Sequence, residues 1–165
     1  MNKATKTAYI SLGSNMGDRL QYLKTAVAQI GLKLGKVVTA SKVYEAAAWG
    51  YTKQPDFYNQ VIEIQTTLSP AQLLDGCLEI EKSLGRTRTK LWGERTLDLD
   101  ILLYDDRSVQ LETLKIPHPY LHLRKFVLVP ICEIAPDLLH PILELKMSRL
   151  LEKCTDELDI KPLGS

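Results

Sequence analysis

The chain has 165 residues, of which 45% are hydrophobic and 25% are charged, a composition typical of an ordinary globular protein. It contains 21 Lys and Arg residues against 20 Asp and Glu residues, and the resulting net charge of +1 gives no global field that would attract nucleic acid. Collagen-like and disulfide-scaffold proteins are excluded, and a chain of this length can bury about 70% of the surface of its unfolded form. We therefore expect a single domain over residues 1–165 that does not bind nucleic acid.

The cysteines and the apolar segments indicate the compartment. Cys77, Cys132 and Cys154 are odd in number, far apart and without a C-x-x-C pair, so they are interpreted as reduced thiols. No segment reaches the ~18 apolar residues that a membrane span requires, and the N-terminus lacks the apolar run of a signal peptide. We expect a cytoplasmic protein without membrane contact.

The first elements in chain order are a strand, a helix and a pair of strands. Turn residues Gly13, Ser14 and Asn15 end the first apolar run, and the helix that follows has Asp18 as its cap and Gly31 as its stop. The expected elements are a strand over 8–12, a helix around 20–30, and antiparallel strands over 37–43 and 58–67. The loop between the last two strands is too long for a tight hairpin and carries three aromatic residues, which favours a functional loop.

The second half begins with a helix whose cap and first turn are Ser69 and Pro70 and which Gly85 closes. The further expected elements are a central strand over 96–104, an edge segment near 109–116, a turn at 117–119, and helices over 126–134 and 147–158. This order, β-α-β-β-α-β with appended pieces, predicts an α+β, ferredoxin-like fold with a mainly antiparallel sheet. Two helices would cover one face, and the other face would carry the active site.

Asp98 and Asp100 are the most informative residues of the central strand. Side chains of a strand alternate between its faces, so both carboxylates project from the same face while Leu97, Leu99 and Ile101 point into the core. Two ionised carboxylates side by side are costly without cations, and oxygen ligands of this kind suit Mg²⁺. The alternative is a pair of aspartates that form ion pairs with nearby arginines.

A cationic segment precedes this strand. Arg86, Arg88, Lys90 and Arg95 are crowded, and arginine side chains bind phosphate oxygens in a bidentate manner, so this segment favours a phosphate ligand. A solvated charge run on a surface loop is the alternative. Trp92 is either a core anchor or a residue that closes over a bound nucleotide, with Gly93 as a hinge.

His118 and His122 are spaced as i and i+4, but Pro119 and the lack of an H-E-x-x-H motif argue against zinc. His118 is better interpreted as a hydrogen-bond donor to a phosphate or a ribose.

The motifs together resemble a known family. AYISLGSNMGDR, WGYTKQPDFYNQV, IEKSLGRTRTKLWGERTLDLDILLY and IPHPYLHLRKFVLVPICEIAPD are similar to segments of 6-hydroxymethyl-7,8-dihydropterin pyrophosphokinases, enzymes of folate biosynthesis. The resemblance extends from about Tyr9 to Pro141. It implies transfer of the β,γ-diphosphate of ATP to the hydroxymethyl oxygen of the pterin, with release of AMP. It also implies two Mg²⁺ ions bound by Asp98 and Asp100.

The resemblance assigns further residues to the two substrates. Arg86 and Arg95 would act in catalysis together with the two aspartates, and Arg88 and Trp92 would belong to the loop that seals the ATP. The remaining nucleotide contacts would be Glu81, Ile101, His118 and Arg124. The pterin would lie between Phe57 and Phe126, its ring edge would meet the Asn59 amide, and the further substrate-binding residues would be Ala47 and Trp49.

The chain departs from the family pattern at a few positions. Ala46, Ala47 and Ala48 stand where the family commonly has a Thr-Pro-Pro stretch, so contacts by Ala46 and Ala47 are expected from backbone groups only. Leu78 and Thr113 fall where some members have residues that touch ATP, and neither is expected to do so here.

Two other interpretations remain open at this point. One is a different Mg-dependent enzyme, such as a nucleotidyltransferase or a glycosyltransferase, which would leave Phe57, Asn59 and Phe126 without a purpose. The other is a non-catalytic ferredoxin-like module, which would leave the paired aspartates and their nearby cations unexplained. The family is usually monomeric, so a monomer is the expectation from resemblance.

Overall fold

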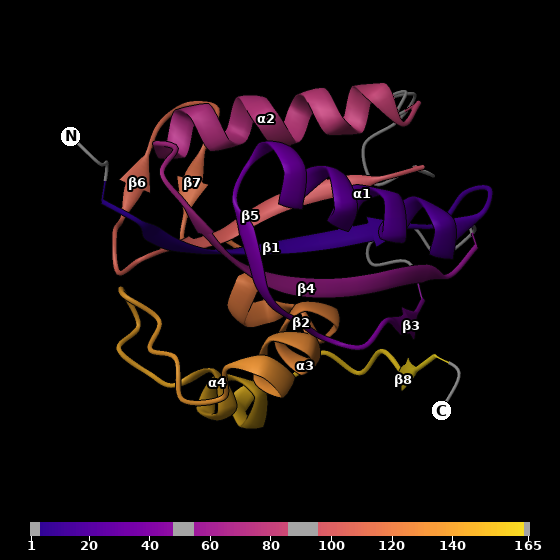
Figure 1. Ribbon diagram of the computed structural model, residues 1–165. Coiled ribbons are helices and arrows are strands. Elements are labelled where there is room, and N and C mark those ends of the chain that lie inside the picture. The colour runs from indigo at the N-terminus through magenta and orange to yellow at the C-terminus, as the bar shows by residue number, and fades with distance from the viewer. Residues whose placement is uncertain (1–3, 48–54, 86–95, 164–165) are drawn as a thin grey trace.

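The computed structural model describes residues 4–47, 55–85 and 96–163. In this part of the chain an antiparallel sheet lies between two pairs of helices (Figure 1). The strands of this sheet are β1 (Lys6–Ser14), β2 (Lys36–Ala40), β3 (Tyr44–Ala46), β4 (Phe57–Thr66), β5 (Asp98–Tyr104) and β8 (Ile160–Pro162). The helices are α1 (Arg19–Lys33), α2 (Pro70–Ser83), α3 (Lys125–Ile134) and α4 (Met147–Lys153). None of the helices in these ranges is long and apolar enough to span a bilayer.

The strand order is β5-β1-β4-β3-β8, and β2 also pairs with β4. Every pairing within this sheet is antiparallel. With β2 and β3 taken as one interrupted strand, the chain path through β5 is that of the ferredoxin-like fold, which confirms the predicted fold class. Helices α1 and α2 cover one face of the sheet (Figure 1). Their side chains and those of the strands form one buried apolar cluster, which includes Ile10, Leu12, Leu23, Ile30, Ile62, Ile64, Leu73 and Ile80.

The second face is only partly open, because α3 and α4 pack against it. A second buried cluster joins these helices to the sheet and includes Tyr9, Val61, Leu102, Leu103, Val127, Leu128, Ile131, Met147 and Leu150. The two appended helices therefore close one part of the face that the sequence assigns to the active site. The site is confined to the part that they leave.

Helix α1 does not stop at Gly31 but continues to Lys33. The close approach that demands a glycine occurs at Gly35, where a Cβ would lie 2.3 Å from the carbonyl oxygen of Gln65. A Cβ at Gly31 would meet only Val37, at 3.7 Å. The helix therefore ends where the chain must pass the backbone of β4, and not at the first glycine in the sequence.

The predicted strand over 37–43 is interrupted. It consists of β2 and β3, and between them the Ser41 hydroxyl accepts a hydrogen bond of 3.0 Å from the backbone N–H of Val61. A side chain thus replaces a backbone partner in the ladder, and the strand direction can change at this point. The predicted edge segment is likewise a separate hairpin of β6 (Val109–Gln110) and β7 (Lys115–Ile116).

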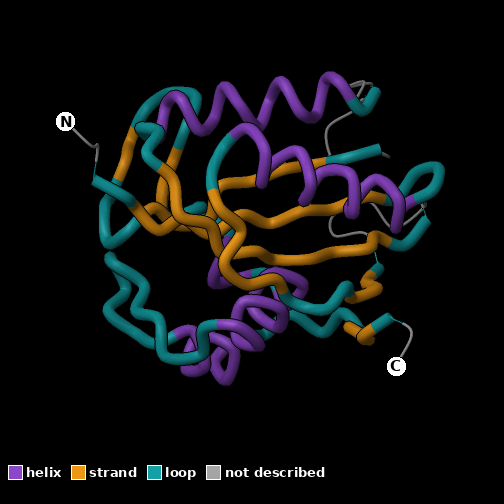
Figure 2. The backbone as a smooth tube through the Cα atoms, in the orientation of Figure 1, coloured by secondary structure: helices purple, strands orange, loops and turns teal. Residues whose placement is uncertain are grey.

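The predicted C-terminal helix is shorter than expected. Helix α4 ends at Lys153, and the chain then turns back toward the sheet and forms β8, which the sequence did not indicate. Figure 2 shows this return as a loop between α4 and the short strand at the C-terminal end. The helix predicted from the periodicity is wrong after residue 153, because the following residues form hydrogen bonds with α3 and β3 instead of continuing the helix.

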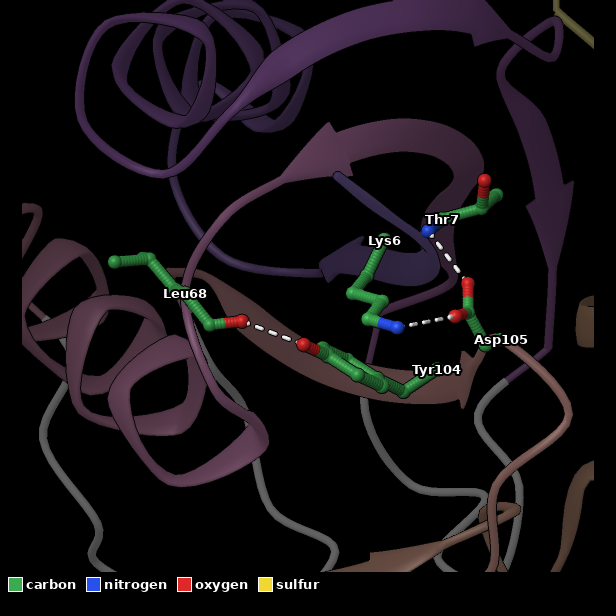
Figure 3. Close-up of polar contacts among 5 residues, drawn as sticks. All are labelled: Lys6, Thr7, Leu68, Tyr104 and Asp105. Atoms are coloured by element: carbon green, nitrogen blue, oxygen red, sulfur yellow. Dashed lines mark hydrogen bonds and ion pairs between the residues drawn. The ribbon is translucent and has the colours of Figure 1, made fainter. Parts of the chain in front are cut away.

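Hydrogen bonds fix the C-terminal end of β5 (Figure 3). The Thr7 N–H donates to Asp105 Oδ1 at 2.8 Å, and Lys6 Nζ lies 3.7 Å from Asp105 Oδ2. The Tyr104 hydroxyl donates to the carbonyl oxygen of Leu68 at 2.7 Å. These contacts tie β5 to β1 and to the loop before α2, and so hold the strand that carries both aspartates.

Candidate active site

Asp98 and Asp100 lie on the open part of the second face. Leu97, Leu99 and Ile101 belong to the cluster beneath α1 and α2, so the alternate residues point to the opposite side. Both aspartates are half-buried, and Asp100 keeps 37% of its side chain exposed. Further along the same face the strand becomes apolar and is covered by the appended helices. The predicted common face of the two carboxylates is therefore present.

His118 lies beside this pair, with its Nε2 4.0 Å from Asp100 Oδ1. The backbone N–H of Tyr120 donates to His118 Nδ1 at 3.1 Å, so in the neutral ring Nε2 carries the proton and faces the carboxylate. Burial, together with the charge of Arg124, lowers the pKa of His118 to about 4, while Asp98 opposes this shift. His118 is thus a neutral hydrogen-bond donor at neutral pH.

Arg124 supplies a positive charge close to the carboxylates. Its side chain is buried, with 8% of the residue exposed. The guanidinium carbon lies 4.9 Å from the centre of the Tyr120 ring and 5.5 Å from that of Phe126. Burial lowers the pKa of Arg124, and Asp100 and Asp98 raise it. The guanidinium remains charged, and the aromatic rings fix its direction.

The strand register places a polar row across the open face. Asp98 pairs with Gly13, Gly13 pairs with Asn59, and Asn59 pairs with Tyr44. Since neighbouring strands are about 4.8 Å apart, Asp98 and Asn59 lie about 10 Å from each other on the two sides of Gly13. A Cβ at Gly13 would lie 3.1 Å from Asn59 Oδ1. The missing side chain therefore lets the Asn59 amide pack closely against Gly13, which is itself buried.

Asn59 carries a buried donor, and the residue is only 3% exposed. Its Nδ2 has no hydrogen-bond partner among the described residues. A buried amide donor without a partner costs about 1–3 kcal/mol and is rare in native proteins. Such a group fits a ligand that accepts a hydrogen bond at this point.

Aromatic and apolar groups flank the amide. A Cβ at Gly13 would lie 3.5 Å from Phe57 Cδ1, so the Phe57 ring lies over this glycine. Ala46 pairs with Phe57 across β3 and β4, and Ala47 follows it. Phe126 lies in the first turn of α3, against the second apolar cluster.

Two of the residues predicted to contact the nucleotide, Ile101 and Glu81, have buried side chains. The Ile101 side chain is 4% exposed and points into the core beneath α1 and α2, so a nucleotide contact would have to come from its backbone. Glu81 is also 4% exposed, and its Oε2 accepts a hydrogen bond of 2.7 Å from the Leu99 N–H. Glu81 thus holds the backbone of β5 between the two aspartates, and its contact with the nucleotide stays a prediction.

Residues 9–136 match the family described as 7,8-dihydro-6-hydroxymethylpterin-pyrophosphokinase (HPPK). The chain belongs to this family. A 2-amino-4-hydroxy-6-hydroxymethyldihydropteridine pyrophosphokinase of Haemophilus influenzae is 45% identical over 156 residues, which cover 94% of this chain and 97% of that protein. The Bacillus subtilis protein of the same name is 48% identical over 128 residues, which cover 77% of each chain.

Some HPPK relatives are much longer. The folic acid synthesis protein fol1 of Pneumocystis carinii is 42% identical over 158 residues, and the chain spans 21% of its length. A crystal structure of Plasmodium falciparum HPPK-DHPS is similar in fold, with a TM-score of 0.75 at 18% sequence identity. The similar region covers 92% of this chain and 44% of that chain. Family membership favours pyrophosphokinase chemistry over both alternatives that the sequence left open.

Five predicted site residues of the HPPK pattern lie outside the described residues. They are Trp49, Arg86, Arg88, Trp92 and Arg95. Their roles stay predictions.

Several residues of the site were not predicted from the sequence. Gly13 and Ser14 were interpreted as turn residues, but both belong to β1, which pairs with β4 and β5 on its two sides. Asn15 Nδ2 donates to the carbonyl oxygen of Pro55 at 3.1 Å, and Arg19 Nη1 donates to that of Asp56 at 2.8 Å. These contacts fix the start of β4 just before Phe57. Only the SLGSN motif within the family resemblance could have indicated them.

Proposed function

We propose that this protein transfers the β,γ-diphosphate of ATP to the hydroxymethyl group of 6-hydroxymethyl-7,8-dihydropterin. The hydroxyl oxygen forms a bond to the β-phosphorus, the bond from that phosphorus to the α,β-bridging oxygen breaks, and the hydroxyl proton is lost. The products are AMP and the pterin diphosphate. The observation that carries the proposal is the row Asp98, Gly13 and Asn59, which sets a half-buried carboxylate and a buried amide on the two sides of Gly13 on one face of the sheet.

The donor set fits magnesium. Mg²⁺ commonly takes one or two protein carboxylates and completes its octahedron with water and substrate phosphates. Among the described residues no group of three or more His, Cys, Asp and Glu side chains could hold a metal, so an all-protein cage is not the basis of this assignment. We assign two Mg²⁺ ions to Asp98 and Asp100. Bound there, magnesium would neutralise negative charge on the phosphoryl oxygens.

Arg124 and His118 suit the triphosphate. A guanidinium that lies near two aromatic rings can bind phosphate oxygens without losing its proton, and neutral His118 can donate from Nε2. The proposed nucleotide site also includes Glu81, Ile101, Arg88 and Trp92. Arg86 and Arg95 are assigned to stabilising the charge that builds up on the transferred group.

The pterin is assigned to the other end of the row. Asn59 can donate and accept hydrogen bonds at the same time, as the amide-like edge of a pterin requires. Phe57 and Phe126 are assigned to its two ring faces, and the further contacts to Trp49 and to the backbone of Ala47. Within the described ranges Asn59 Nδ2 has no hydrogen-bond partner, which supports this arrangement.

The assay that tests the proposal is analysis of the nucleotide products by chromatography and of the pterin product by mass spectrometry. The purified protein is incubated with ATP, Mg²⁺ and 6-hydroxymethyl-7,8-dihydropterin, and parallel reactions omit the pterin or the metal. AMP and pterin diphosphate should form only in the complete mixture. ADP as the product would show γ-phosphoryl transfer and refute the proposed reaction.

We further propose that the protein acts as a monomer in the cytoplasm and that residues 1–165 form one catalytic domain. The three cysteines are free thiols, which agrees with a reducing compartment.

A further inference from the structure

The C-terminal segment after α4 returns to the sheet and reaches two elements of the proposed pterin site. In Figures 1 and 2 it runs from the α3 and α4 side of the sheet to β8, beside β3. Helix α3 carries Phe126, and β3 carries Ala46. The segment lies beyond residues 9–136, the part of the chain that matches the HPPK family.

The first contact of this segment is at the N-terminus of α3. Asp156 Oδ2 accepts a hydrogen bond of 3.0 Å from the N–H of Lys125, the residue directly before Phe126. The N-cap residue of the helix, Arg124, makes no side-chain capping hydrogen bond, so Asp156 provides a cap from a distant part of the chain. A carboxylate at this position satisfies a free backbone donor and interacts favourably with the helix dipole. The other oxygen, Oδ1, accepts from the Leu158 N–H at 3.1 Å and thereby orients the carboxylate.

The second contact is with β3. Residues Ile160–Pro162 pair antiparallel with Tyr44–Ala46, in a register that sets Ile160 opposite Ala46. The Leu163 N–H extends the pairing by donating to the Val43 carbonyl oxygen at 2.8 Å. Strand β8 therefore holds the edge of β3 at the point where Ala46 lies opposite Phe57.

The other end of α3 contacts β3 and the residues before it directly. Glu133 accepts hydrogen bonds from the Tyr44 hydroxyl at 2.6 Å and from the Lys42 N–H at 3.1 Å. Helix α3 is thus fixed to the start of β3 at its C-terminal end. At the N-terminal end of α3, where Phe126 lies, Asp156 accepts the hydrogen bond from the first backbone N–H of the helix.

We propose that residues 156–163 are a positioning element for the pterin, which fixes Phe126 and Ala46 relative to each other through Asp156 and β8. This rests on the proposed function. Asp156 acts through the N-terminus of α3 and not by touching the substrate. Losing it should loosen Phe126 while the aspartate pair on β5 stays in place.

The experiment compares Asp156→Ala with Asp156→Asn, which keeps an acceptor of the same shape. Asp159→Ala is the matched control, since Asp159 is an exposed carboxylate of the same segment. For Asp156→Ala, the KM for the pterin should rise about fivefold, the change expected from the loss of one helix-capping hydrogen bond, with an unchanged KM for ATP. Asp156→Asn should restore most of the affinity, and Asp159→Ala should behave as the wild type.

A second variant tests the other contact and protects against a folding failure of the first. Lys161 lies opposite Glu45, and Lys161→Pro removes a backbone N–H from β8. It should also raise the KM for the pterin alone. If Asp156→Ala and Lys161→Pro lower only the melting temperature, or raise both KM values equally, the positioning role is refuted. If the wild type is active and the variants behave in either of these ways, only the positioning role is refuted. If the wild type forms no AMP, the proposed function and the positioning role are both refuted.

Discussion

At the scale of single residues, β5 places the carboxylates of Asp98 and Asp100 on one face and its apolar side chains on the other. Alternation along β5 sends Leu99 and Ile101 into the core and leaves both carboxylates half-buried on the open face. A substitution at Asp100 therefore removes a proposed metal ligand without creating a cavity. The effects of a substitution at Asp100 on catalysis and on stability can therefore be measured separately.

Asp100→Asn should lower kcat at least about a hundredfold, because a lost metal ligand costs several kcal/mol of stabilisation in the transition state. Its free energy of unfolding should stay close to that of the wild type, since one of two neighbouring like charges is removed. Rates of AMP formation and urea unfolding measure the two effects. Asp106→Asn, at an exposed aspartate that follows the same strand, is the control. A variant with unchanged turnover would contradict the assignment of Asp100 to the metal.

Gly13→Ala should weaken pterin binding by about a factor of ten while ATP binding is kept. The new Cβ would lie 3.1 Å from Asn59 Oδ1, so the amide must shift by a few tenths of an ångström. Binding constants for the two substrates measure the split. Gly31→Ala is the control, because its Cβ has space inside α1, and it should stabilise the protein by about 0.5–1 kcal/mol. Equal loss of affinity for both substrates would contradict the proposed location of the pterin.

At the scale of elements, the bond between Glu133 and Tyr44 joins α3 to β3. Tyr44 is buried, and burial together with its hydrogen bond to Glu133 raises its pKa to about 12. Tyr44 also pairs with Asn59, so the joint between the two elements lies directly beside the proposed pterin amide.

Tyr44→Phe should lower the free energy of unfolding by about 2 kcal/mol, the value of a hydrogen bond to a charged group, and raise the KM for the pterin about threefold. Tyr9→Phe is the matched control, because its hydroxyl donates to Glu63 at 3.1 Å beneath the appended helices. The control should lose stability without a change in the KM. Should both variants raise the KM for the pterin alike, the effect would be one of general stability.

At the scale of the whole molecule, buried histidines make stability depend on pH. His140 is 4% exposed, and its Nδ1 accepts from the backbone N–H groups of Ile142 and Leu143 at 3.2 and 3.0 Å. Burial, followed by the charge of His122, lowers the pKa of His140 below its ordinary value of 6.5. The unfolded chain therefore binds a proton at a higher pH than the folded protein does. Stability is fully present above about pH 6.5 and falls as the pH drops below it.

His140→Asn should reduce this loss of stability, because an asparagine oxygen can accept from the same N–H groups and does not titrate. Urea unfolding at neutral pH and at about pH 5 measures the difference between the two proteins. Some dependence should remain, since the pKa of His118 is lowered to about 4. An equal loss of stability in wild type and variant would contradict the role of His140.

The sequence by itself determined what depends on neighbours along the chain. The alternation at Asp98, Leu99 and Asp100 shows the shared face of the carboxylates, the cap at Ser69 marks the start of α2, and the motifs indicate the family. Only the tertiary structure decided the row from Asp98 through Gly13 to Asn59, because strand register is set by pairing between distant segments. It alone also decided that the segment after α4 leaves its helix, since Asp156 and β8 find their partners on α3 and β3 and not on adjacent turns.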